Sequence, residues 1–227
     1  MYNRTSFILS VLLLGSIAVT VPSVASAQVV VAQRTTNQEV KQLLEDGRRM
    51  VDSGDYNGAI NVYQQAASLE PKNASIYSGI GYLQALQGNF QAALSSYRRA
   101  VSLNPNNGDY QYALAYISGN LGDNRTAKDA YRKAIQLNRN SVDAYLGLAT
   151  VLLRLGETSN AMWATEQAMN LDRNNPQVFE LRGTFLMKQG KRGDAATLFR
   201  RARDIYARQG KQENVSRIDA TLRQLGG

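Results

Sequence analysis

The sequence predicts an all-α fold, namely an α-solenoid of five helix-turn-helix units followed by one C-terminal capping helix. Two observations predict it. The stretch QAALSSYRRAVSLNPNN, which begins at Gln91, returns 34 residues later as RTAKDAYRKAIQLNRNS, which begins at Arg125. The same offset relates five consecutive units over residues 40–207, and repeats of this length are typical of helical pairs that stack on their neighbours.

The first 27 residues are expected to be a secretory signal peptide. Arg4 is the only charge before an apolar run over residues 7–21, which Pro22 ends. Residues 25–27, Ala-Ser-Ala, then supply the small side chains of a cleavage site. The apolar run is shorter than the about 20 residues that a membrane span needs. Cleavage is therefore favoured over an alternative in which the segment stays as a membrane anchor.

Residues 28–39 follow the signal and are expected to form a flexible leader. Three valines are followed by the polar stretch AQRTTNQ, and no repeat column extends into this segment.

The repeated units of residues 40–207 share small residues at fixed places. One column holds glycine: Gly54, Gly88, Gly122, Gly156 and Gly190. Two columns hold alanine: Ala59, Ala93, Ala127, Ala161 and Ala195, then Ala66, Ala100, Ala134, Ala168 and Ala202. The two alanine columns lie on one helical face, where small side chains let a neighbouring helix approach closely. Tyr63, Tyr97, Tyr131 and Phe199 are expected to fill the space beside them.

The turn between the two helices of a unit is predicted from local signals. Only glycine takes a left-handed C-terminal cap without steric cost, so the glycine column ends the first helix. Asp55, Asn89 and Asp123 follow directly and can cap the second helix. Pro71 and Pro105 end that second helix in their units. Each unit is therefore two antiparallel helices, and stacking five of them buries what one pair leaves exposed.

The repeat resembles the tetratricopeptide repeat, a 34-residue helix-turn-helix motif. The stretch over residues 76–105 carries the signature most fully, with Tyr77, Gly81, Phe90, Ala93, Tyr97, Ala100 and Pro105 at the positions of that family's signature residues. Other units depart from it, because Thr165 replaces the tyrosine, and Arg139 and Arg173 replace the proline. Looser packing or altered turns are expected in the later units.

Residues 208–227 are expected to form a capping helix. Val215, Ile218, Leu222 and Leu225 recur at helical spacing and give this segment one apolar face. The resemblance implies that this face covers the last repeat. The alternative is a helix that binds a partner.

Composition excludes several classes of active site. The chain has neither histidine nor cysteine, which removes thiolate nucleophiles, disulfides, zinc fingers and histidine-based triads. No phosphate-binding glycine loop and no metal-ligand cluster is present in the sequence. We therefore expect no cofactor, no metal and no catalytic residues.

The candidate binding site is a groove. The resemblance implies that the first helices of successive units line a concave surface that accepts peptides. One column follows the small residues of these helices and holds Arg48, Tyr82, Tyr116, Thr150 and Thr184. Tyr112 and Leu146 lie one turn earlier on the same face. The predicted partner-binding residues are Arg48, Tyr82, Tyr112, Tyr116, Leu146 and Thr150. The alternative is that the tyrosines only pack between repeats.

The function expected from these features is a non-catalytic adaptor or scaffold in the cell envelope that binds a protein or peptide. Export makes nucleic acid an unexpected partner, and the periplasm is the expected compartment, with a photosynthetic lumen or the medium as alternatives. Two other functions stay open. One is an envelope carbohydrate-active enzyme that uses carboxylates. The other is a lipid-surface protein, because the net charge is +8 and basic pairs such as Arg98-Arg99 recur with the repeat.

Overall fold

The computed structural model describes residues 24–226, and over this range the chain is entirely helical apart from turns. The chain divides into two units, residues 1–39 and residues 40–227. The helices are α1 (Val24–Asp52), α2 (Tyr56–Leu69), α3 (Ala74–Leu86), α4 (Phe90–Leu103), α5 (Gly108–Asn120), α6 (Asn124–Leu137), α7 (Val142–Arg154), α8 (Thr158–Leu171), α9 (Pro176–Lys188), α10 (Arg192–Arg208) and α11 (Gln212–Leu225).

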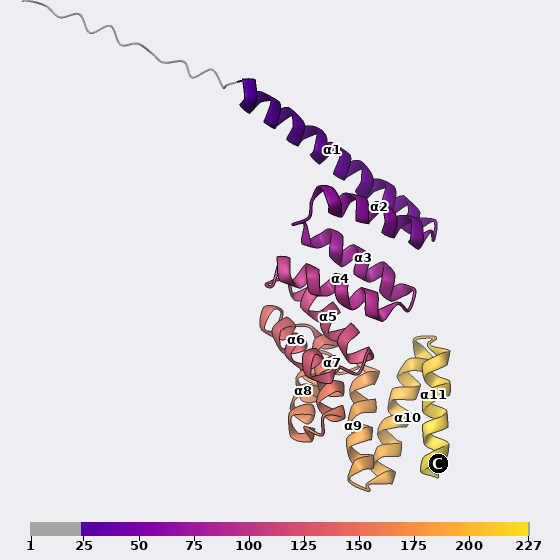
Figure 1. Ribbon diagram of the computed structural model, residues 1–227. Helices are drawn as coiled ribbons and strands as arrows, with labels where there is room; N and C mark the ends of the chain where they lie inside the picture. The colour runs from indigo at the N-terminus through magenta and orange to yellow at the C-terminus, as the bar shows by residue number, and fades with distance from the viewer. Residues whose placement is uncertain (1–23, 227) are drawn as a thin grey trace, which may run out of the picture. The chain divides into compact units, whose positions relative to one another are not determined.

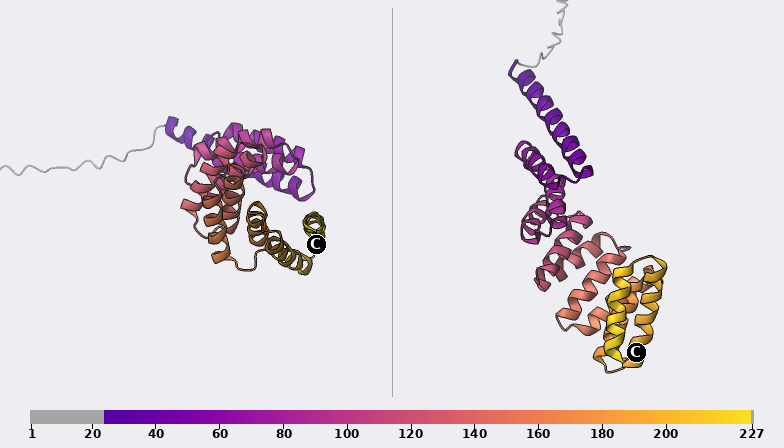
Figure 2. Two further views of the ribbon diagram at one scale, coloured as in Figure 1. Left: turned by 90° about the horizontal axis from the view of Figure 1, so that it is seen from below. Right: turned by 90° about the vertical axis from the view of Figure 1, so that its right-hand side faces the viewer.

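In the second unit the helices form the expected array of antiparallel pairs (Figure 1). The part of α1 from Val40 onward pairs with α2, and α3 with α4, α5 with α6, α7 with α8 and α9 with α10. Successive pairs are rotated with respect to one another (Figure 2). The all-α solenoid of about five repeats with a capping helix is therefore confirmed.

The leader differs from its expected form. Residues 28–39 are helical and belong to α1, which begins at Val24. No glycine or proline occurs from residue 23 to residue 46. Extending a helix that has already formed adds a hydrogen bond for each residue, so nothing in this stretch stops it. Residues 1–23, which hold most of the predicted signal peptide, lie outside the described residues, and cleavage after Ala27 stays a prediction.

The turns follow the predicted chemistry closely. All five glycines of the column have positive φ, between 76° and 82°. The Asp55 side chain accepts a hydrogen bond from the Gly58 amide at 2.9 Å, and Asp123 accepts from Thr126 at 3.1 Å. Asn89 takes the N-cap position of α4 but makes no capping hydrogen bond with its side chain.

Small residues bring the helices together as predicted. The first alanine column is fully buried in all five repeats, and in the second no residue exceeds 3% exposure. The aromatic column packs against small residues of the first helices. A Cβ added to Gly81 would touch the ring of Tyr97, and one added to Gly183 would touch Phe199, both at 3.0 Å. In the fourth repeat, the buried hydroxyl of Thr165 donates to the Ala161 carbonyl at 2.8 Å instead.

The C-terminal helix α11 covers the last repeat. Val215, Ile218 and Leu222 are buried in one cluster with Phe199 and Tyr206, and Leu225 packs against that cluster. In Figure 1, α11 lies directly beside α10. The expected capping helix is therefore present.

Candidate functional site

The residues of the predicted groove line two separate hollows on the first helices. Tyr82 and Tyr116 are the two most exposed tyrosines among the described residues, at 54% and 47%. Tyr82 and Arg48 line a hollow of about 160 Å³ between α1 and α3, which we call the small hollow. Tyr112, Tyr116, Leu146 and Thr150 line a hollow of about 430 Å³, which we call the large hollow. About half of the Tyr82 and Tyr116 side chains is therefore open to solvent.

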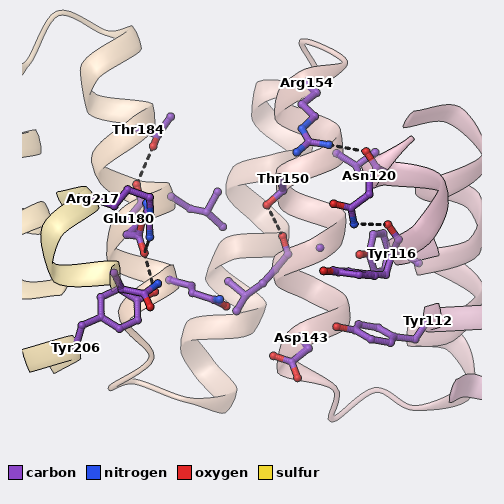
Figure 3. Close-up of a pocket in the computed structure, with 18 residues that line it drawn as sticks. Tyr112, Tyr116, Asn120, Asp143, Thr150, Arg154, Glu180, Thr184, Tyr206 and Arg217 are labelled. Carbon is purple, nitrogen blue, oxygen red and sulfur yellow. Dashed lines mark hydrogen bonds and ion pairs between the residues drawn. The ribbon is translucent and has the colours of Figure 1, made fainter. Parts of the chain in front are cut away.

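The large hollow is formed by the first helices α5, α7 and α9 together with the capping helix α11. In Figure 3, Tyr112 and Tyr116 of α5 lie on one side, and Glu180, Tyr206 and Arg217 lie on the other. Helix α7 lies between them and carries Leu146 and Thr150. Leu146 is buried, and the Thr150 hydroxyl donates to the Leu146 carbonyl at 2.9 Å. These two predicted site residues therefore form the floor of the large hollow.

A third tyrosine, Tyr131 of the aromatic column, also lines the large hollow, although the repeat pattern predicts only packing for it. The ring of Tyr131 meets that of Tyr112 edge-on, with centroids 5.8 Å apart. Tyr131 reaches this place across Gly147, where a Cβ would overlap its ring. Burial raises the pKa of the Tyr131 phenol well above its usual value, and the neighbouring Tyr112 and Tyr116 raise it further. Gly147 was the signal in the sequence, because a glycine inside a helix admits a neighbouring side chain.

The opposite wall of the large hollow is held by the carboxylate of Glu180, which is not among the predicted site residues. Arg217 donates two hydrogen bonds to Glu180, at 2.6 and 3.0 Å, and the Tyr206 hydroxyl donates a third at 2.7 Å. The carboxylate of Glu180 raises the pKa of Arg217, and burial together with Glu180 raises that of Tyr206. This Glu180 cluster joins α9, α10 and α11. Glu180 could have been found, because it stands 34 residues after Leu146.

Helix α7 carries a charged side chain at each end, and only the one at the C-terminal end, Arg154, has a hydrogen-bond partner among the described residues. The Arg154 guanidinium, in the last turn, donates to the Gly119 carbonyl at 2.8 Å. Asp143, in the first turn, is exposed, and no described residue forms a hydrogen bond or an ion pair with it. Its charge raises the pKa of the nearby Tyr112, although burial is the larger cause. Figure 3 shows Asp143 near Tyr112 and far from Arg154.

The recurrent basic pairs are partly used inside the fold. Arg99 donates to the Pro71 carbonyl at 3.0 Å, and its guanidinium lies 5.5 Å from the centre of the Tyr77 ring. Arg201 lies 4.3 Å from the centre of the Phe179 ring. In the pairs Arg98-Arg99 and Arg200-Arg201, the second arginine therefore fastens the second helix of a repeat to its first.

Residues 24–226 lack two further features, a metal site and a membrane span. In this range, no group of three or more acidic side chains is placed to hold a metal ion. None of the helices described here combines the length and apolar character needed to cross a membrane.

Comparison with protein families identifies the repeat. A TPR repeat family matches residues 47–88, and two tetratricopeptide repeat families match residues 74–107 and 121–184. Together they cover more than half of the chain. No curated protein matches the sequence.

Solved structures with the same fold span most of the chain. The crystal structure of MamA is 25% identical, with a TM-score of 0.67, and covers 73% of this chain and 96% of its own. YrrB, described as a TPR protein with an unusual peptide-binding site, is 18% identical, with a TM-score of 0.68, and covers 84% and 97%. A tetratricopeptide repeat protein from Parabacteroides merdae is 19% identical, with a TM-score of 0.67, and covers 82% and 80%. With its in-register columns, its stacked helical pairs and these matches, the chain is a tetratricopeptide repeat protein.

Proposed function

We propose that this protein is a non-catalytic adaptor that binds a peptide segment of a partner protein along its first helices, with the large hollow as the main anchor point. Tetratricopeptide repeat proteins generally mediate protein–protein interactions. The observation that carries the proposal is the half-exposed Tyr116 beside Tyr112, over a hollow that no side chain of the described residues fills.

Tyrosine suits this role for a physical reason. Its ring buries a large apolar area at a small cost in side-chain entropy, and its hydroxyl keeps a polar contact. Interfaces concentrate their binding energy in a few such aromatic side chains. We therefore expect Tyr116 and Tyr82 to contribute more than the rest of the groove.

The arrangement of carboxylates favours binding over hydrolysis. Two carboxylates line the large hollow, Asp143 and Glu180. Glu180 is already engaged by Arg217 and Tyr206. A glycoside hydrolase needs a carboxylic acid and a second free carboxylate that act together. Of the two carboxylates that line the large hollow, only Asp143 is without an ion-pair partner among the described residues.

The test is capture of the partner by the full chain bearing Tyr82→Ala and Tyr116→Ala. We expect the double variant to lose capture while circular dichroism and Tm stay close to those of the wild type. Met162→Ala is the matched control, because Met162 is as exposed as Tyr116, at 47%, but lies on the second helix α8. A joint loss of fold and capture would mean that the tyrosines are structural. Undiminished capture by a folded double variant would move the binding site elsewhere.

We further propose that the partner belongs to the cell envelope and that the periplasm is the place of binding. The supporting observation is the order of a positive residue, an apolar run and small residues over residues 1–27. N-terminal sequencing of the protein from its native host should give Gln28 as the first residue. A chain that begins at Met1 in a membrane fraction would contradict this proposal.

A further inference from the structure

The large hollow has one end where negative charge is left without a partner. Asp143 lies there on the first turn of α7, and Asp109 occupies the same repeat position on the first turn of α5. Both residues line a smaller adjoining hollow of about 210 Å³, which Tyr112 also lines. We call Asp109, Asp143, Tyr112 and Tyr116 the acidic end.

The absence of a basic partner at the acidic end is unexpected for this chain. Lysine and arginine number 26, against 18 acidic residues. Within the described residues, no basic side chain pairs with Asp109 or Asp143. The two arginines that line the large hollow are occupied at other places, Arg154 on the Gly119 carbonyl and Arg217 on Glu180. The hollow is therefore open to a cation from outside.

The tyrosines supply the second element of a cation site. A guanidinium or an ammonium is attracted to the face of an aromatic ring, and more strongly when a carboxylate is also within reach. Tyr116 is half-exposed and Tyr112 is partly buried, so ring surface is available beside the carboxylates. This chain uses the same contact internally, where Arg99 lies over Tyr77 and Arg201 lies over Phe179.

A purely structural role explains the two carboxylates less completely. An acidic residue in the first turn stabilises a helix by about 0.3–1 kcal/mol through the helix dipole. That role needs no aromatic neighbour and no hollow. The helix N-terminus carries about half a positive charge, and the full charge of each carboxylate outweighs it.

We infer that the acidic end receives a basic side chain, Arg or Lys, of the partner peptide, with its cation over the Tyr112 and Tyr116 rings and Asp143 and Asp109 as counter-ions. This inference rests on the proposed function, since it names the chemistry of the peptide that the groove binds. It gives the groove a direction, because the basic residue of the peptide must lie toward the N-terminal ends of α5 and α7.

The experiment is selection of random decapeptides by surface display against the full chain, followed by affinity measurement on the best peptide. We expect a fixed Arg or Lys position in the selected set. Replacing that Arg by citrulline, or that Lys by acetyl-lysine, should weaken binding about tenfold. The same loss should follow from Asp109→Asn with Asp143→Asn. Asp129→Asn is the matched control, because Asp129 is exposed on α6 and has no ion-pair partner among the described residues.

The outcomes separate the two proposals. If no peptide is selected by the wild type, or if the tyrosine variants select equally well, the proposed function itself fails. If peptides are selected through the tyrosines but show no basic position, the inference is wrong and the adaptor function stands. The inference is also wrong if the Asp109→Asn and Asp143→Asn double variant binds the basic peptide as tightly as the wild type. Raising the salt concentration from 0.1 to 0.5 M should weaken peptide binding by the wild type but not by the Asp109→Asn and Asp143→Asn double variant. That result would support the ion contacts.

Discussion

The small and large hollows come from the same repeat columns, yet they differ in depth and chemistry. Both contain a tyrosine of the second helix and a glycine of the first helix that follows, Tyr63 with Gly79 and Tyr131 with Gly147. The small hollow holds about 160 Å³ and the large one about 430 Å³. Only the large hollow has a wall from α11. The repeat alone therefore supplies a shallow hollow, and the capping helix α11 adds a wall that makes it larger.

Removing α11 should therefore have the largest effect. A chain that lacks residues 211–227 exposes the apolar side of the fifth repeat, including Phe199 and Tyr206. Terminal repeats need a polar outer face, so we expect aggregation and loss of peptide capture together. Size-exclusion chromatography and light scattering would measure the aggregation of the truncated chain. A monomeric truncated chain of unchanged Tm would contradict the capping role and point to a partner-binding helix.

The next largest effect on stability is expected from replacing two glycines at equivalent repeat positions, Gly147 and Gly79, by alanine. A Cβ on Gly147 would overlap the Tyr131 ring, so Gly147→Ala should destabilise the fold by about 1–3 kcal/mol through overpacking. A Cβ on Gly79 would meet Tyr63 at 3.4 Å, an ordinary contact. Gly79→Ala should then stabilise the fold by about 0.5–1 kcal/mol, because alanine favours the helix.

Thermal or urea denaturation of both variants measures the difference. Equal shifts of the same sign would mean that Tyr131 relaxes without cost. In that case, Gly147 would not be the reason why the tyrosine reaches the large hollow.

What the sequence predicted was determined by local rules that hold in each repeat. Positive φ at Gly54 and its equivalents, buried alanine columns and the apolar face of α11 follow from steric fit and helical spacing, so all were predictable. The exposure of the Tyr82 and Tyr116 side chains could also be predicted, because both residues occupy the same position in successive repeats.

The features that the sequence did not predict depend on contacts between helices of different repeats. The Glu180 cluster joins residues from three helices, and Arg217 lies 37 positions after Glu180, outside the 34-residue register. Tyr131 reaches the hollow because a residue of the next repeat is glycine. Asn89 takes the predicted N-cap position, but its side chain makes no capping hydrogen bond.

A smaller effect is expected from the Glu180 cluster. Arg217→Ala leaves the mostly buried Glu180 carboxylate with only the Tyr206 hydroxyl, while Arg217 itself is half-exposed. We expect a loss of about 1 kcal/mol in the free energy of unfolding. Arg208→Ala is the control, since Arg208 is exposed on α10 and has no ion-pair partner among the described residues, and it should change stability by less than about 0.5 kcal/mol. Equal Tm values for the two variants would show that the cluster does not fasten α11.

Ionisation of the tyrosines of the aromatic column should change stability only in alkaline solution, so this effect is the smallest near neutral pH. Burial, with a smaller contribution from Tyr82, raises the pKa of Tyr97 to about 12, from the ordinary value of 10.0. Below pH 10 the phenol is protonated in both the folded and the unfolded chain, and the stability from its burial is fully present. Between pH 10 and about 12 the unfolded chain ionises first, so the free energy of unfolding falls as the pH rises. The pKa of Tyr131 is raised in the same direction and extends the loss to higher pH. Denaturation at pH 8 and pH 11 should show this drop in the wild type, and Tyr97→Phe should reduce it. An unchanged drop in Tyr97→Phe would show that Tyr97 ionises alike in the folded and unfolded chain, and that its phenol is not held in the dry interior between α3 and α4.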